Sequence, residues 1–239
     1  MTLLEVCVDD AAGLEAALAG GADRIELCAA LELGGLSPSP GLVALAARID
    51  RPVRAMVRPR PGDFVFTDGD EAAMLAEIAA IRAAGLSGVV LGASRPDGRL
   101  DLDRLARLAG AAAGMGRTLH RAIDLVPDIG EAVEAAVALG FDTILTSGRA
   151  LSAPEGLDEL ERAHTIAAGR ITIMAGAGVN VATAPQILKR VPLAALHGSC
   201  SEPAPEAGAA ARRLGFASPQ RRMTSAAKVA ALKAAIQAG

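Results

Sequence analysis

The stretch Gly21-Ala-Asp-Arg-Ile-Glu-Leu-Cys28 contains the pattern that decides the fold. A glycine follows a helical run, two residues intervene, and a short run of mostly apolar residues begins. Related stretches are Gly85-Leu-Ser-Gly-Val89 and Gly140-Phe-Asp-Thr-Ile144. A glycine in the left-handed conformation commonly ends a helix. Each of these stretches therefore predicts a short link from a helix into a strand.

This alternation continues along the whole chain of 239 residues. Short apolar runs predict strands at 3–8, 24–29, 53–59, 88–93, 118–123, 143–147, 171–175 and 195–199. Runs with helical spacing separate them, and Ser39-Pro40 predicts a capped helix start. Such alternation is typical of parallel strands with crossover helices. Eight units fit a closed barrel better than an open doubly wound sheet, so we expect an α/β (β/α)8 barrel.

We expect one domain over residues 1–239, because a single barrel commonly has about 250 residues. Residues 201–225 are rich in Pro, Ala, Gly and Arg, and they predict a long loop after the eighth strand. Residues 226–239 predict a C-terminal helix. A long loop on this face is often a lid or a subunit contact.

Composition argues against several classes of partner. The net charge is −3, aromatic residues make up 2%, and Trp and Tyr are absent, so nucleic acid is not expected as a partner. The three cysteines include no Cys-x-x-Cys, which argues against a secreted disulfide framework. The first residues do not resemble a signal peptide, and no apolar stretch reaches 18 residues. We therefore expect a cytoplasmic protein without a membrane partner.

Ionisable side chains interrupt strands that should be buried on both faces. Side chains two residues apart share a strand face, so Glu5 lies with Cys7 and Glu26 with Cys28, and we place both pairs inward. Catalytic residues of barrels lie at the carboxyl ends of strands. We therefore take Glu26, His120 and Asp124 as hypothetical residues for acid–base catalysis. The ligand-binding candidates are Glu5, Arg58, Arg60, Arg121, Gly176, Gly178 and His197.

Each group has a structural alternative. Arg58 and Arg60 present planar forks suited to an anionic or polyhydroxy ligand, and the alternative is that they fill the barrel with ion pairs. Gly176 and Gly178 can bind phosphate or form a tight turn, and Asn180 is a plausible cap for the next helix. The two phenylalanines at 64 and 66 can cover a ligand or pack over the barrel.

The cysteines suggest a metal site. Cu(I) prefers thiolate ligands, and Cys7 and Cys28 occupy matched positions on neighbouring strands, with Cys200 near strand one in a closed barrel. A buried cysteine also serves as a small apolar residue. A divalent ion could instead use His120, Glu26, Asp124 and His197. No Gly-x-Ser-x-Gly motif supports a hydrolase.

The motifs together resemble the CutC copper homeostasis family. They are Leu4-Glu-Val-Cys7, Gly21 to Ala29, Gly34-Gly-Leu-Ser-Pro38, Val57-Arg-Pro-Arg60 with Gly62-Asp-Phe64, Leu119-His-Arg-Ala122 with Asp124, Leu145-Thr-Ser-Gly148 and Ile173-Met-Ala-Gly-Ala-Gly-Val179. They run from residue 4 to about residue 199, and the tail from 201 is least like the family.

The resemblance implies a cytoplasmic barrel that forms a homodimer or larger homo-oligomer, with a role in copper tolerance and Cu(I) bound by Cys7 and Cys28. Two hypotheses follow. The chain is a Cu(I)-binding protein of metal homeostasis, or it is a barrel enzyme acting on a small anionic or sugar-like substrate.

Overall fold

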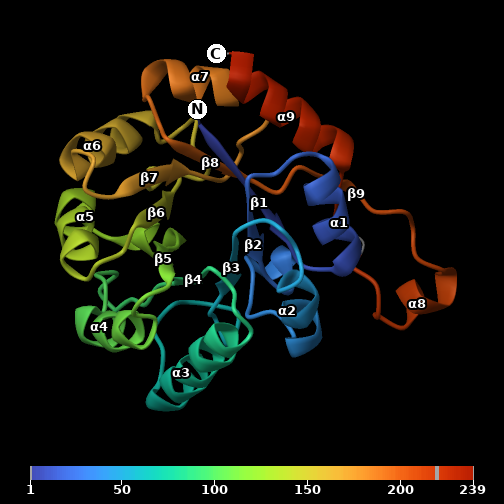
Figure 1. The fold of residues 1–239 in the computed structure, drawn as a ribbon, viewed down its shortest axis with the longest axis horizontal. Helices are drawn as coiled ribbons and strands as arrows, with labels where there is room; N and C mark the ends of the chain where they lie inside the picture. Colours follow the sequence, from blue (N-terminus) through green and yellow to red (C-terminus); the bar gives the residue numbers. More distant parts are fainter. Residues whose placement is uncertain (1, 219–220, 239) are drawn as a thin grey trace.

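Eight parallel strands close into a barrel in chain order, as expected from the sequence (Figure 1). The computed structural model describes residues 2–218 and 221–238. The strands of the barrel are β1 (Leu3–Val8), β2 (Arg24–Leu27), β3 (Val53–Met56), β4 (Gly88–Leu91), β5 (Gly116–Leu119), β6 (Thr143–Thr146), β7 (Thr172–Ala175) and β8 (Ala195–Gly198). Hydrogen bonding between β1 and β8 closes the ring.

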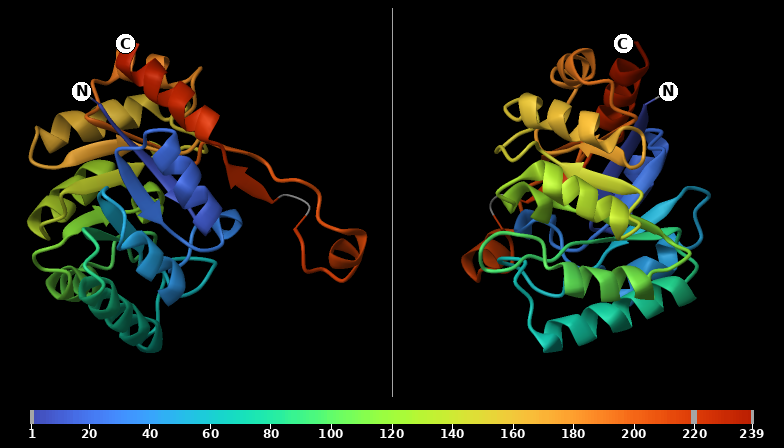
Figure 2. Two further views of the ribbon diagram at one scale, coloured as in Figure 1. Left: turned by 45° about the vertical axis from the view of Figure 1, so that its right-hand side comes forward. Right: turned by 90° about the vertical axis from the view of Figure 1, so that its left-hand side faces the viewer.

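Helices surround the barrel and connect its strands (Figures 1 and 2). They are α1 (Ala11–Ala19), α2 (Pro40–Ala46), α3 (Asp68–Ala83), α4 (Leu102–Ala111), α5 (Ile129–Ala138), α6 (Leu157–Ala167), α7 (Ala184–Arg190) and α9 (Ala226–Ala238). Short 3-10 helices η1 (Leu31–Leu33) and η2 (Arg121–Leu125) follow β2 and β5. None of the helices in the described ranges is long and apolar enough to cross a membrane.

The predicted helix ends are confirmed. Gly21, Gly85 and Gly140 have φ of 85°, 79° and 73°, the left-handed backbone that a side chain would disfavour. The hydroxyl of Ser39 accepts a hydrogen bond from the backbone N–H of Leu42 at the start of α2. These local signals fix where each helix ends and the next strand begins.

Several element boundaries differ from the sequence prediction, since six of the eight strands end one to four residues earlier than expected. The fifth strand ends at Leu119 rather than at residue 123, because His120 caps η2 through its own side chain. Asn180 does not cap α7, which begins at Ala184. The side-chain oxygen of Asn180 accepts hydrogen bonds from the N–H groups of Ala182 and Thr183. These bonds stabilise a turn before α7.

Alternate strand residues divide the core into two layers. Leu4, Val6 and Val8 of β1 belong to the large aliphatic cluster between barrel and helices. Glu5 and Cys7 lie on the opposite face, inside the barrel, as the period of two predicts. The polar interior is therefore fixed by the same alternation that builds the core.

Residues 201–225 form the predicted long connection after β8, and it contains regular structure. Strands β9 (Ser201–Pro203) and β10 (Arg222–Thr224) pair antiparallel at its base, and α8 (Ala209–Arg213) lies farther out. Figure 2 shows this arm extending away from the barrel before the chain returns to α9. Leu214 and Phe216 near its end are 57% and 83% exposed.

Candidate functional site

Three neighbouring strands place four ionisable side chains inside the barrel. The register aligns Glu5 with His197 across β1 and β8, and Cys7 with Glu26 across β1 and β2. All four residues are buried. Because each side chain points inward from an adjacent strand, the closing seam of the barrel becomes a compact polar cluster.

Glu5 is the most enclosed member of this cluster. It forms an ion pair with Arg24 of β2 and accepts a hydrogen bond from Nδ1 of His197 at 2.9 Å. Burial acts to raise the pKa of Glu5, but the hydrogen bond from His197 and the charge of Arg24 outweigh it and hold the pKa at about 2. Glu5 is therefore a carboxylate that fixes the orientation of the imidazole.

The other imidazole nitrogen faces Glu26. Nε2 of His197 lies 3.8 Å from a carboxylate oxygen of Glu26, and the Cys28 thiol donates to that carboxylate at 3.5 Å. Burial raises the pKa of Glu26. Burial works in the opposite direction on His197, but the charge of Glu26 and the contacts with Cys7 and Glu5 raise its pKa well above the usual value. The site therefore holds a positively charged imidazole between two carboxyl groups.

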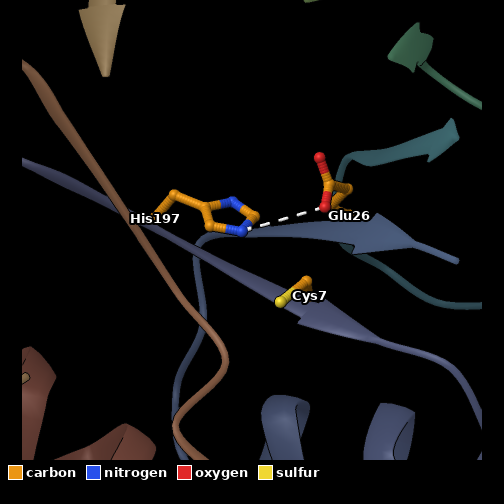
Figure 3. A group of neighbouring side chains, drawn as sticks. All are labelled: Cys7, Glu26 and His197. Atoms are coloured by element: carbon orange, nitrogen blue, oxygen red, sulfur yellow. Dashed lines mark ion pairs between the residues drawn. The ribbon is translucent and has the colours of Figure 1, made fainter. Parts of the chain in front are cut away.

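Cys7, Glu26 and His197 can together offer three ligand atoms to a metal ion. One atom from each side chain lies within 4.8 Å of the other two, and the three side chains face a common point (Figure 3). Cys28 is not a member of this group. Burial raises the pKa of the Cys28 thiol well above its usual value, so it is held as a neutral thiol. The structure thus brings the predicted ligand Cys7 together with His197 rather than grouping it with Cys28.

His120 lies at the carboxyl end of β5. Its Nδ1 accepts a hydrogen bond from the N–H of Ala122 at 3.1 Å, so the proton of the neutral ring is on Nε2. Burial and the nearby Arg58 lower the pKa of His120 to about 3. The sequence suggested His120 as a residue for acid–base catalysis, and the enclosed ring is a neutral hydrogen-bond donor.

Arg58 and Arg60 hold the loop after β3. Arg58 donates to the carbonyl oxygens of Leu33, Gly35 and Gly62, at 2.8–2.9 Å. Arg60 pairs with Asp63 and Asp70 outside the barrel interior. Of the two arginines, only Arg58 is buried.

The two phenylalanines of this loop differ in role. Phe66 packs in the aliphatic core. Phe64 contacts the His120 ring at 4.7 Å between centroids and lies 5.0 Å from Cζ of Arg58. The loop therefore packs down over the end of β5.

Asp124 and Arg121 join the ends of β5 and β6. The carboxylate of Asp124 accepts hydrogen bonds from the hydroxyls of Thr146 and Ser147, from backbone N–H groups that follow β6, and from Arg121. Both carboxylate oxygens of Asp124 thus accept hydrogen bonds. None of these contacts of Asp124 and Arg121 is with Glu26 or Cys7. This arrangement favours a positioning role for Asp124.

Gly176 and Gly178 form a tight turn after β7. A Cβ atom on Gly176 would lie 2.5 Å from the side chain of Leu145, and Gly178 has φ of 74°. Both glycines are accounted for by packing and backbone conformation. The structural alternative noted from the sequence fits both positions, and ligand binding by these glycines stays a prediction.

Sequence reasoning missed two contributors to the site. Arg24 neutralises Glu5 through its Nε. Nη2 of the same guanidinium lies 3.4 Å from the sulfur of Met174, across the barrel. Arg24 stands two residues before Glu26, so the same alternation that placed Glu26 inward also predicts an inward Arg24. No local signal indicates the contact with Met174.

A cleft of about 210 Å³ lies outside the barrel, beside α4 and α5. It is lined by Arg95, Arg99, Leu100, Leu102, Val126, Pro127, Asp128, Glu131, Ala132 and Ala135. No residue predicted as catalytic, ligand-binding or metal-binding lines it.

Known proteins share both the sequence and the barrel. The profile of the CutC family matches residues 2–202. The chain belongs to the CutC family. A CutC family protein of Sinorhizobium medicae is 57% identical over 236 residues, which cover 99% of this chain and 96% of the relative. A CutC family protein of Caulobacter vibrioides is 50% identical over 238 residues, covering 99% of this chain and 97% of the relative.

Solved structures agree with this membership. The CutC structure from Streptococcus agalactiae is 29% identical, with a TM-score of 0.79, and the match covers 83% of this chain and 99% of that one. Phosphoribosylanthranilate isomerase of Thermotoga maritima matches all of both chains at 11% identity and a TM-score of 0.61, which shows a shared barrel fold alone. The family resemblance predicted from the motifs is confirmed. The CutC profile ends within β9, where the arm begins.

Proposed function

We propose that this CutC family member binds copper(I) inside the barrel, through Cys7 and His197 with Glu26 beside them. The observation that carries the proposal is the approach of three ligand atoms to within 4.8 Å of one another. Thiolate and imidazole are ligands that suit copper. The Streptococcus agalactiae relative bears a name linked to copper homeostasis, which supports the same choice of metal.

The surroundings of His197 support a ligand role. Metal-binding histidines commonly donate their second N–H to a carboxylate, which fixes the tautomer. Here Nδ1 of His197 bonds to Glu5, and Nε2 is the nitrogen on the side of Glu26. Loss of the imidazolium proton on binding would expose a lone pair already oriented toward the other two ligands.

Arg24 already neutralises Glu5, so the remaining ionisable groups of the site are Glu26, His197 and Cys7. A Cu⁺ ion and the Cys7 thiolate that binds it form a neutral pair, which limits the charge that the buried site has to hold. We also propose a cytoplasmic setting, because Cys7, Cys28 and Cys200 are free and a reducing compartment preserves thiols.

Anaerobic titration with Cu(I) against a competing chelator tests the proposal. Cys7→Ser and His197→Gln should each weaken binding at least about tenfold, since each removes one ligand. Cys28→Ser is the matched control, because that thiol lies outside the group, and it should change affinity less than twofold. Unchanged affinity in Cys7→Ser would refute the site. A loss in Cys28→Ser with none in His197→Gln would instead favour the two-cysteine site.

A further inference from the structure

Two buried N–H groups lie at the carboxyl ends of the barrel strands, here called the mouth of the barrel, and have no hydrogen-bond acceptor among the described residues. They are Nε2–H of His120 and Nε–H of Arg58, on residues that are 4% and 5% exposed. Neither atom has a hydrogen-bond partner within the described residues. Leaving a buried donor unsatisfied is costly, so such groups in a folded protein call for an explanation.

The side chains that carry the two donors both contact one aromatic ring. Phe64 contacts the His120 ring at 4.7 Å between centroids, and Cζ of Arg58 is 5.0 Å from the centre of the same ring. Phe64 belongs to the loop that Arg58 holds through the carbonyl of Gly62. The side chain of a loop residue therefore packs against both residues that carry the unpaired donors.

The His120 ring packs against a glycine that follows the neighbouring strand β4. A Cβ atom on Gly92 would lie 2.4 Å from Cε1 of His120, so the imidazole packs directly on the backbone of the segment that follows β4. The hydrogen bond from the backbone N–H of Ala122 to Nδ1 also holds the His120 ring in place. His120 is thereby held with Nε2–H as its one free polar group.

The local charge indicates which ligand fits. Arg58 has three carbonyl partners and no carboxylate within ion-pair distance among the described residues. Its positive charge is buried without a negative counterpart, and burial and the neighbouring Arg60 lower its pKa. A neutral His120 adds a donor without adding charge. An anion with a second, neutral oxygen would satisfy both groups.

We propose that the mouth of the barrel binds a small 2-oxo or 2-hydroxy carboxylate, with its carboxylate at Nε of Arg58 and its second oxygen at Nε2 of His120. The ligand takes the place of the Phe64 ring, which turns outward to admit it while Phe66 stays in the core and Arg58 keeps its carbonyl partners. This site shares no residue with the group formed by Cys7, Glu26 and His197, so it goes beyond metal binding and stands independently of it.

Pyruvate, with acetate and chloride as comparison anions, is the probe for the first test. Long-range ¹H–¹⁵N spectra of the histidine side chains report the tautomer and hydrogen bonding of each ring. Without ligand, His120 should appear as the Nε2–H tautomer at pH 7. Saturating pyruvate should shift Nε2 of His120 and leave His164 unchanged, whereas chloride should shift neither. An unperturbed His120 signal at saturating pyruvate would overturn the proposal.

A gain of affinity provides a test that misfolding cannot imitate. Phe64→Ala removes the side chain that competes for the site, so calorimetry should give about tenfold tighter binding of pyruvate than to the unmodified protein. Adding His120→Phe to Phe64→Ala should abolish this binding, because the ring shape stays and the donor is lost. Adding Arg60→Gln is the matched control and should leave affinity unchanged. Equal or weaker binding by Phe64→Ala, or equal loss with Arg60→Gln, would contradict the assignment.

Discussion

Cys7 and Glu26 stand opposite each other in the register of β1 and β2, so a sulfur and a carboxylate share one layer of the barrel interior. One is a soft ligand and the other a hard one. His197 from β8 completes the group. This pairing of unlike ligands has consequences for which metal the site prefers.

Glu26→Gln should separate soft from borderline metals. The carboxylate contributes charge and a hard oxygen, which matter more for Zn²⁺ than for Cu(I). We expect Zn²⁺ affinity to fall at least about tenfold and Cu(I) affinity to fall much less. Parallel competition titrations of both metals measure the difference. Equal losses for the two metals would mean that Glu26 does not choose between them.

The ion pair of Glu5 and Arg24 should be costly to break from one side. Glu5→Gln leaves a buried guanidinium without its counter-charge, and breaking such a pair typically costs about 3–5 kcal/mol. Urea unfolding measures the loss. The double variant Glu5→Gln, Arg24→Met should be less destabilised than the sum of the two single variants. Strict additivity would show that the two residues are not energetically coupled.

Acid should weaken the contact between α3 and α4 through Glu71. Hydrogen bonds from Arg107 and Arg104 hold the pKa of this carboxyl at about 2, below its ordinary value of 4.5. Because the folded-state pKa is lower, its stabilisation is present above pH 4.5 and is lost as the pH falls toward 2. The linked contribution is at most about 3 kcal/mol. Stability measured against pH should be flatter over this window in Glu71→Gln, and an unchanged slope would be inconsistent with the ion pairs.

Gly92→Ala should displace the His120 ring, because the added Cβ would lie 2.4 Å from Cε1. We expect a loss of about 1–3 kcal/mol, typical of overpacking, together with altered side-chain signals of His120. Gly110→Ala in α4 is the matched control, since an added Cβ there has no neighbour within 4 Å. It should stabilise the protein by about 0.5–1 kcal/mol. An undisturbed His120 spectrum in Gly92→Ala would argue against the packing described.

The exposed end of the arm should matter for self-association. Exposed large apolar side chains can mark interaction sites. Homo-oligomer formation remains a prediction from the family resemblance. If the arm forms the contact, Phe216→Asp should lower the mass measured by light scattering without changing the unfolding midpoint. Leu151, which is 88% exposed on the barrel itself, offers the matched control Leu151→Asp. If only the Leu151 variant dissociates, the contact lies elsewhere.

Much of the fold could be predicted because its signals are local. Alternation of apolar runs and glycines at helix ends indicated eight units, and the period of two indicated the inward faces of Glu5 and Glu26. The fifth strand was overestimated because the imidazole of His120 caps η2, a bond that apolar patterning does not reveal.

The grouping of site residues depended on contacts between distant strands. Cys7 meets His197 only because β1 and β8 close the ring in one particular register. The hydrogen-bond partners of Arg58 are backbone carbonyls, which a pattern of side chains in the sequence cannot predict. The tautomer of His120 depends on a single N–H two residues later. Sequence therefore indicated which residues face inward, but it could not show which of them meet.

The bond between Glu5 and His197 joins residues 192 positions apart, on the first and last strands of the barrel. A ribosome makes Glu5 early and His197 late. Until the eighth strand emerges, a growing chain can offer Glu5 only the partner on β2, and Glu26 lacks its imidazole altogether. A ring that closed without β8 would bury Glu26 without the imidazole that faces it, which is costly for a charged carboxylate. The polar seam therefore disfavours closure of the ring before β8 has been made.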